Sequence, residues 1–207
     1  MTNKKYLCLS AFLALFLALF ISCTTEITLT VRQDDSVDIT FDGGAGEAFT
    51  KMLLSSSGAE DGMSAIDTEE ISFELAKAGF DNVRVAAKDT SVKIAMTDKK
   101  RSSYIFKSGI AKYAGGKLAV NLSRKSLEDF YASSDEQTRM MLDLFLAPVF
   151  NDENMRESEY LEMLASFYGK AASKEVESSF VSIKLIGKDG KEEKINLPVT
   201  QIMCGIF

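Results

Sequence analysis

The sequence predicts an α+β fold: an antiparallel sheet built from N- and C-terminal hairpins and a central meander, with helices packed on one face. Apolar and polar residues alternate near both ends of the chain, over 27–41 and 180–197, as in half-buried strands. Short strand patterns with few helices between them occupy 83–122, and helical patterns fill most of 124–177. This segregation of strands and helices is typical of α+β domains rather than of alternating βαβ units.

The chain opens with an apolar segment that follows two lysines. Lys4 and Lys5 precede the run Tyr6 to Ile21, which contains almost no polar side chain. A positive start, an apolar stretch and a small residue before a cleavage site describe a secretory signal. The run is about 16 residues long, whereas a helix needs about 20 residues to cross the hydrocarbon core of a bilayer. A single-span membrane anchor is the alternative.

A cysteine ends the apolar segment and indicates how it is processed. Phe20-Ile21-Ser22-Cys23 resembles a bacterial lipobox, before whose cysteine lipoprotein signal peptidase cuts. Leu is the commonest residue where this chain has Phe20, and such relaxed lipoboxes are familiar from spirochaete lipoproteins. The resemblance implies that Cys23 becomes an N-terminus carrying fatty acyl chains such as palmitate. Ordinary signal cleavage, with Cys23 unmodified, is the other interpretation.

The expected organisation is therefore a signal peptide over 1–22 and a single α+β domain over 23–207, tethered through Cys23. The resemblance implies export from the cytoplasm and attachment to the cell membrane or outer membrane, because several acyl chains hold a protein firmly to a bilayer. Loss of two lysines with the signal makes the net charge of −6 more negative by two. An acidic domain is a poor match for nucleic acid or for anionic headgroups, so we expect no nucleic-acid partner.

The first expected element of the domain is a β-hairpin. Apolar residues alternate over 27–31 and 37–41 around the turn 33–36, so one face of the hairpin is buried. The stretch 30–39, soon after the cysteine, is similar to the opening of small envelope lipoproteins of the mycobacterial LppM type. That likeness implies a non-enzymatic domain that contacts lipid, and it carries no functional residue across.

The middle of the chain predicts two helices and four strands. A helix over 47–55 follows the glycine-rich turn 42–46, which we interpret as a flexible turn rather than a phosphate loop. Asp67 and Glu70 form a capping-box pattern for a second helix that ends at Gly79. The strands are expected over the ranges 83–87, 91–97, 103–107 and 117–122.

Helices and a final hairpin complete the fold. The helical patterns cover 125–132, 136–146 and 158–177. Strands over 180–186 and 193–197 flank Lys188-Asp189-Gly190, and Asp-Gly between alternating strands is a strong turn signal.

The helical region supplies the candidate binding surface. Methionine and aromatic residues adapt to irregular apolar shapes such as lipid tails or partner helices. The candidate ligand-binding residues are Met141, Phe145, Met163, Phe167 and Tyr168. The alternative interpretation of these residues is a packed core between the helices and the sheet.

Composition narrows the chemistry further. The chain contains no histidine, which removes the commonest general base and the usual ligand of transition metals. Cys204 lies in an apolar tail with no basic neighbour, so we interpret it as a buried small hydrophobe. Acidic clusters near 34–42 and 152–162 lack the spacing of a calcium loop, and we expect neither a metal nor a cofactor.

The function expected from these observations is a non-catalytic, membrane-anchored lipoprotein that binds a lipid, an apolar ligand or a partner protein in the cell envelope. Two alternatives remain open: a hydrolase that works with paired carboxylates, and a purely structural or surface-exposed lipoprotein.

Overall fold

The computed structural model describes most of the chain from Thr25 to Ile206. The described residues are 25–44, 46–48, 50, 67–88, 90–133, 139, 143 and 155–206. Cys23, Met141 and Phe145 lie outside them, as do the expected signal peptide and most of the helices expected over 47–55 and 136–146.

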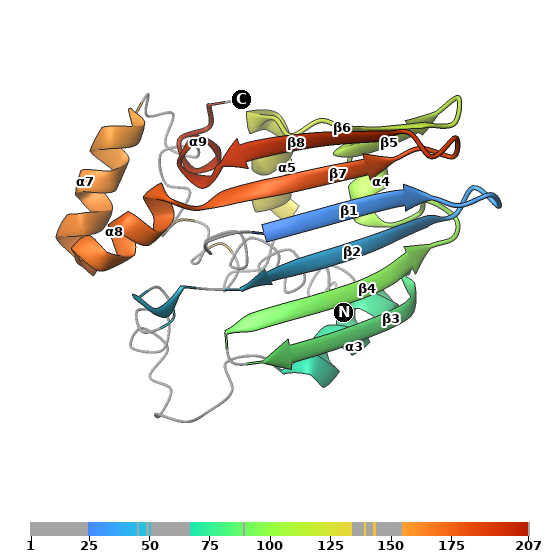
Figure 1. Ribbon diagram of the computed structural model, residues 1–207, viewed down its shortest axis with the longest axis horizontal. Helices are drawn as coiled ribbons and strands as arrows, with labels where there is room; N and C mark the ends of the chain where they lie inside the picture. The colour runs from blue at the N-terminus through green and yellow to red at the C-terminus, as the bar shows by residue number, and fades with distance from the viewer. Residues whose placement is uncertain are drawn as a thin grey trace.

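A six-stranded sheet forms the centre of the described structure, with strand order β3-β4-β2-β1-β7-β8 (Figure 1). Its strands are β1 (Thr25–Val31), β2 (Val37–Gly44), β3 (Asp81–Lys88), β4 (Ser91–Asp98), β7 (Phe180–Ile186) and β8 (Glu192–Pro198). The two expected terminal hairpins, β1–β2 and β7–β8, are both present and belong to this one sheet. The structure thus confirms an α+β fold with a mostly antiparallel sheet.

One strand pairing in the large sheet is parallel. β1 runs alongside β7, with Thr25 opposite Val181 and Thr30 opposite Ile186. This pairing joins the two hairpins, so the strand nearest Cys23 in sequence lies in the middle of the sheet. The starts of β1 and β7 consequently lie at the same end of the sheet, and the turns β1–β2 and β7–β8 lie together at the other end (Figure 1).

The core lies on one face of the sheet because the strand residues alternate. Ile27, Leu29 and Val31 of β1 are buried, whereas Glu26 is exposed and Thr28 is half-buried. The same alternation along β2 and β4 produces one apolar face and one polar face, which is the usual pattern of an antiparallel sheet with one solvated side.

Helices and a small hairpin cover the apolar face. The core includes side chains of α3 (Thr68–Lys77), α5 (Arg124–Ser133) and the two-stranded sheet of β5 (Ala111–Ala114) and β6 (Lys117–Val120). The expected N-cap of α3 is confirmed, because Asp67 accepts hydrogen bonds from the backbone amides of Glu69 and Glu70. This cap satisfies amides that have no partner within the helix.

The strand expected over 103–107 is wrong. This stretch contains the short helix α4 (Tyr104–Lys107), and the strand that precedes β6 lies at 111–114 instead. The Asp98 carboxylate accepts hydrogen bonds from the backbone amides of Lys100, Ser102 and Ser103. These bonds turn the chain tightly after β4 and remove it from the sheet.

The single helix expected over 158–177 is also wrong, because it is divided in two. α7 (Glu157–Tyr168) and α8 (Lys170–Glu177) meet at Gly169, whose φ of 88° and ψ of 158° break the helix. A short helix that the sequence pattern did not predict, α9 (Val199–Met203), follows β8. Helices α7, α8 and α9 lie at the end of the sheet where β1 and β7 begin (Figure 1).

Candidate functional site

The apolar residues of α7 divide between the core and the surface. Tyr160 and Leu164 are buried in the core. Met163 and Tyr168 are half-buried, whereas the side chain of Phe167 is 75% exposed. Of the candidate residues on α7, Met163 and Tyr168 are partly buried and pack against the core, whereas Phe167 lies on the surface.

The end of α7 presents an aromatic pair. The rings of Phe167 and Tyr168 lie 6.3 Å apart between centroids and are tilted by 48°, within the range of favourable aromatic contacts. Partial burial raises the pKa of the Tyr168 phenol, which keeps it neutral. The pair combines one exposed ring with one partly covered ring and carries no charge.

Two further exposed hydrophobic residues belong to neighbouring elements. Phe180, the first residue of β7, and Ile206, which follows α9, are both exposed. The sequence did not identify Phe180 as a surface residue, because the alternation of apolar and polar residues predicts a strand but not where that strand lies in the sheet. The exposure of Phe180 follows from its place at the start of β7, next to β1.

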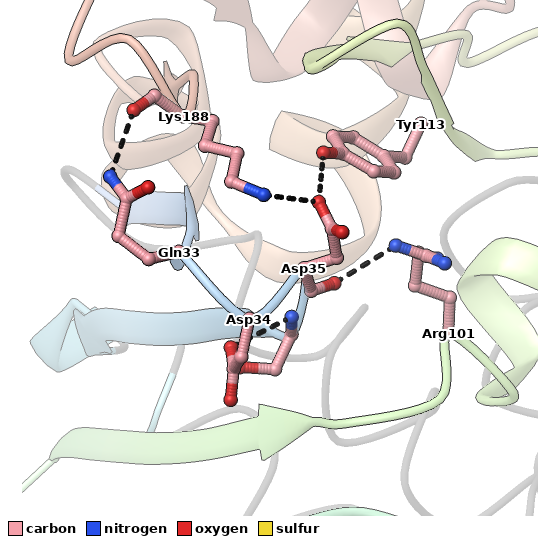
Figure 2. A network of polar contacts seen from close by, with 7 residues as sticks. Gln33, Asp34, Asp35, Arg101, Tyr113 and Lys188 are labelled. Carbon is pink, nitrogen blue, oxygen red and sulfur yellow. Dashed lines mark hydrogen bonds and ion pairs between the residues drawn. The ribbon is translucent and has the colours of Figure 1, made fainter.

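A polar network occupies the opposite end of the sheet (Figure 2). Asp35, in the β1–β2 turn, accepts a hydrogen bond from the Tyr113 hydroxyl at 2.6 Å and pairs with the Lys188 ammonium at 3.0 Å. The Arg101 guanidinium donates to the backbone carbonyl of Asp35 at 2.9 Å and lies 4.8 Å from the centre of the Tyr113 ring. Gln33 donates to the carbonyl of Lys188.

The contacts within the network shift the pKa values of Asp35 and Tyr113 in opposite directions. The Tyr113 hydroxyl, followed by Lys188, holds the pKa of the Asp35 carboxyl below its usual value. In return, the hydrogen bond to Asp35 raises the pKa of the Tyr113 phenol. A general acid or base works best with a pKa near the working pH, and both shifts move away from neutrality. The network connects the β1–β2 turn to the β7–β8 turn, to β5 and to the loop after β4.

The network could not have been predicted as a unit. Asp35 and Tyr113 are 78 positions apart in the sequence, and Asp35 and Lys188 are 153 apart. The sequence indicated only a turn at this position, since Asp tolerates the positive φ of 64° found at Asp35. Only the sheet order brings the side chains to one place.

A third group of reactive residue types lies between α7 and α9. Cys204 is buried and carries a free thiol, as the sequence predicted. Burial, reinforced by the charge of Glu157, raises the pKa of this thiol to about 11. The Glu157 carboxylate accepts a hydrogen bond from the Thr200 hydroxyl. Because a reactive cysteine needs a lowered pKa, this environment makes Cys204 a packing residue.

The first acidic cluster of the sequence disperses in the fold. Asp34 accepts from Ser36, Asp38 pairs with Arg32, and Asp42 pairs with Lys93. Within the described parts of the chain, no three His, Cys, Asp or Glu side chains gather in a way that could hold a metal ion. Likewise, no helix among the described residues has the length and hydropathy needed to cross a bilayer.

Comparison of the chain with protein-family models, with curated proteins and with solved structures finds no match.

Proposed function

We propose that the chain is a membrane-anchored bacterial lipoprotein, tethered through acyl chains on Cys23, whose domain is non-catalytic and binds through an apolar surface in the cell envelope. The observation that carries the proposal is the apolar run that follows Lys4 and Lys5 and ends at Phe20-Ile21-Ser22-Cys23. The relaxed lipobox implies cleavage before Cys23 and acylation of its sulfur.

The fold supports a short tether. β1 begins at Thr25, which is fully buried, so the domain starts two residues after Cys23. The mature charge also supports attachment through acyl chains, because an acidic domain is repelled by anionic headgroups.

The described chemistry supports a binding role rather than a catalytic one. The Asp35 network has pKa shifts that move away from neutrality, and the Cys204 thiol is buried with a raised pKa. The exposed ring of Phe167, beside Met163 and Tyr168, is the described part of the proposed ligand surface. Met141 and Phe145 complete the candidate set from the sequence.

The experiment that tests the proposal is the mass of the mature N-terminal peptide from protein isolated from membranes. We expect a diacyl or triacyl adduct on Cys23, together with loss of both the adduct and membrane fractionation in Cys23→Ala. Cys8→Ala is the matched control, because residue 8 is removed with the signal and the adduct should remain. An unmodified N-terminus at another position would contradict the proposal.

Counting thiols gives an independent check on the same protein. If the Cys23 sulfur is blocked by a thioether, the unfolded mature protein should react with one equivalent of a thiol reagent, through Cys204. Two equivalents would show that Cys23 is free. In the folded protein the reaction should be slow, because Cys204 is buried and its pKa is raised to about 11.

A further inference from the structure

The distance between the proposed anchor and the fold is limited by covalent geometry. Thr25 is the first residue of β1, and Cys23 precedes it by two residues. Successive Cα atoms are about 3.8 Å apart, so the Cα atom of Cys23 lies within about 7.6 Å of that of Thr25. A linker this short keeps the start of β1 next to the headgroups whenever the acyl chains of Cys23 are inserted.

The parallel pairing of β1 and β7 brings a second strand to the same level. Val181 is the β7 partner of Thr25, and Phe180 lies one residue further toward the end of the sheet. The Phe180 side chain is 37% exposed there. The end of the sheet nearest the anchor therefore carries an aromatic ring at its rim.

The helices at this end carry additional apolar surface. α8 leads directly into β7, and α7 packs against α8 (Figure 1). Phe167 on α7 and Ile206 after α9 are exposed, so three of the five large exposed hydrophobic residues in the described parts of the chain belong to this end. Lys170 and Lys174 on α8 are also exposed.

This composition matches the boundary between lipid headgroups and acyl chains. Phenylalanine is among the residues that surface helices bury at that boundary. Exposed acidic residues, Glu159, Glu162 and Glu177, accompany the two lysines at this end, so the match rests on the apolar residues and not on charge. The opposite end of the sheet is different: the β1–β2 and β7–β8 turns contain none of those five exposed hydrophobic residues, and they carry the polar network of Figure 2.

We propose that the end of the sheet formed by the start of β1 and β7, together with α7 and α8, rests on the bilayer, with Phe167 and Phe180 in the interface. The β1–β2 and β7–β8 turns then point away from the membrane. This orientation rests on the proposed function, because it requires acylated Cys23, and it identifies the lipid surface as the occupant of the Phe167 region.

The test uses the full acylated protein on vesicles of phosphatidylethanolamine and phosphatidylglycerol, with an environment-sensitive fluorophore on one introduced cysteine. Ser166→Cys and Ser178→Cys place the reporter beside Phe167 and near Phe180 without removing either ring. Lys191→Cys, in the β7–β8 turn, and Ile195→Cys, in the middle of β8, are the controls. The thioether blocks Cys23, and Cys204 is buried.

We expect the emission at positions 166 and 178 to shift to the blue and to be quenched by spin-labelled lipid, and the emission at 191 and 195 to stay as in water. Adding Phe167→Asp and Phe180→Asp should abolish the shift while the protein still floats with vesicles. The far-ultraviolet circular dichroism of each variant confirms folding.

The outcomes separate the two proposals. If the protein is acylated and floats with vesicles but all four reporters behave alike, the orientation is wrong and the anchor proposal stands. An equal or larger shift at position 191 would likewise overturn the orientation. Absence of the acyl adduct would overturn the anchor proposal, and the orientation with it.

Discussion

Asp35 combines an unusual backbone conformation with three polar contacts. Its φ of 64° lies in the left-handed region, which Asp and Asn tolerate better than most residues. Its carboxylate contacts Tyr113 and Lys188, and its carbonyl accepts from Arg101. A single residue thus connects the β1–β2 turn to β5, to the β7–β8 turn and to the loop after β4.

The Asp35 contacts predict a defined pH window of stabilisation. The pKa of the Asp35 carboxyl is lowered from 3.8 and that of Tyr113 is raised from 10.0 in the folded state. A lowered pKa stabilises the fold above pH 3.8 and loses this effect as the pH falls through the folded-state value. A raised pKa stabilises the fold below pH 10.0 and loses this effect as the pH rises.

We therefore expect Asp35→Asn and Tyr113→Phe to lower the free energy of unfolding near neutral pH, and the two effects should not add, because the two side chains share one hydrogen bond. The difference between Asp35→Asn and the native chain should disappear in acid. Denaturant unfolding over a pH series measures both effects. Asp189→Asn is the control, because the Asp189 carboxylate accepts from Lys191 within its own turn, and it should show no coupling to Tyr113→Phe.

At the scale of elements, Gly169 decides where α7 ends. Its φ of 88° and ψ of 158° place it in a region that is essentially restricted to glycine. No atom lies within 4 Å of a Cβ built on it, so backbone strain rather than a clash opposes substitution.

Both Gly169→Ala and Gly169→Asn should therefore destabilise the fold by about 1–3 kcal/mol. Asn rescues left-handed helical positions but not this region, so the two variants should be similar. Thermal or chemical unfolding measures the change. A more stable Ala variant would mean that α7 and α8 can merge into one continuous helix.

Substitutions on the two faces of α7 should change the stability of the fold by different amounts. Leu164 is buried and Phe167 is 75% exposed. Leu164→Ala should lower the free energy of unfolding by about 2–5 kcal/mol, and Phe167→Ala should change it by less than about 0.5 kcal/mol. Equal losses in chemical denaturation would show that Phe167 belongs to the core and would remove it from the proposed membrane contact.

Elements with a strong local signal could be predicted from the sequence. Alternation and the Asp189-Gly190 turn predicted β7 and β8, and Asp67 predicted the start of α3. The strand expected over 103–107 was wrong because the Asp98 carboxylate caps the following turn, and apolar alternation does not report such a cap. The helix break at Gly169 was missed because isolated glycines also occur inside helices.

At the scale of the molecule, the order of strands in the sheet brings together residues whose proximity the sequence could not predict. The parallel pairing of β1 with β7 places Phe180 beside the start of β1. It also places the β1–β2 turn next to the β7–β8 turn, so that Asp35 contacts Lys188. Both arrangements join residues about 150 positions apart, and pairings of that range have no local signal. The candidate residue Phe167 was identified as an aromatic residue of a helical region, but its exposure became evident only in the fold.

The acidic charge of the whole chain predicts how it is held to membranes. Attachment through acyl chains is apolar, so about 1 M salt, which shortens the Debye length to about 3 Å, should not release the protein from vesicles. More phosphatidylglycerol should not tighten the association either. Flotation of the acylated protein measures both, and release by salt would indicate an electrostatic attachment instead.

The central position of β1 also has a consequence for the order in which the chain folds. Its partner β7 lies close to the C-terminus, so the sheet contains contacts of large sequence separation, and such contacts form slowly. A chain that emerges from its N-terminus can form the β1–β2 hairpin early, but one edge of β1 stays unpaired until residues 180–186 have emerged. Completion of the fold is thereby delayed until nearly the whole chain has left the site of synthesis or the translocation channel.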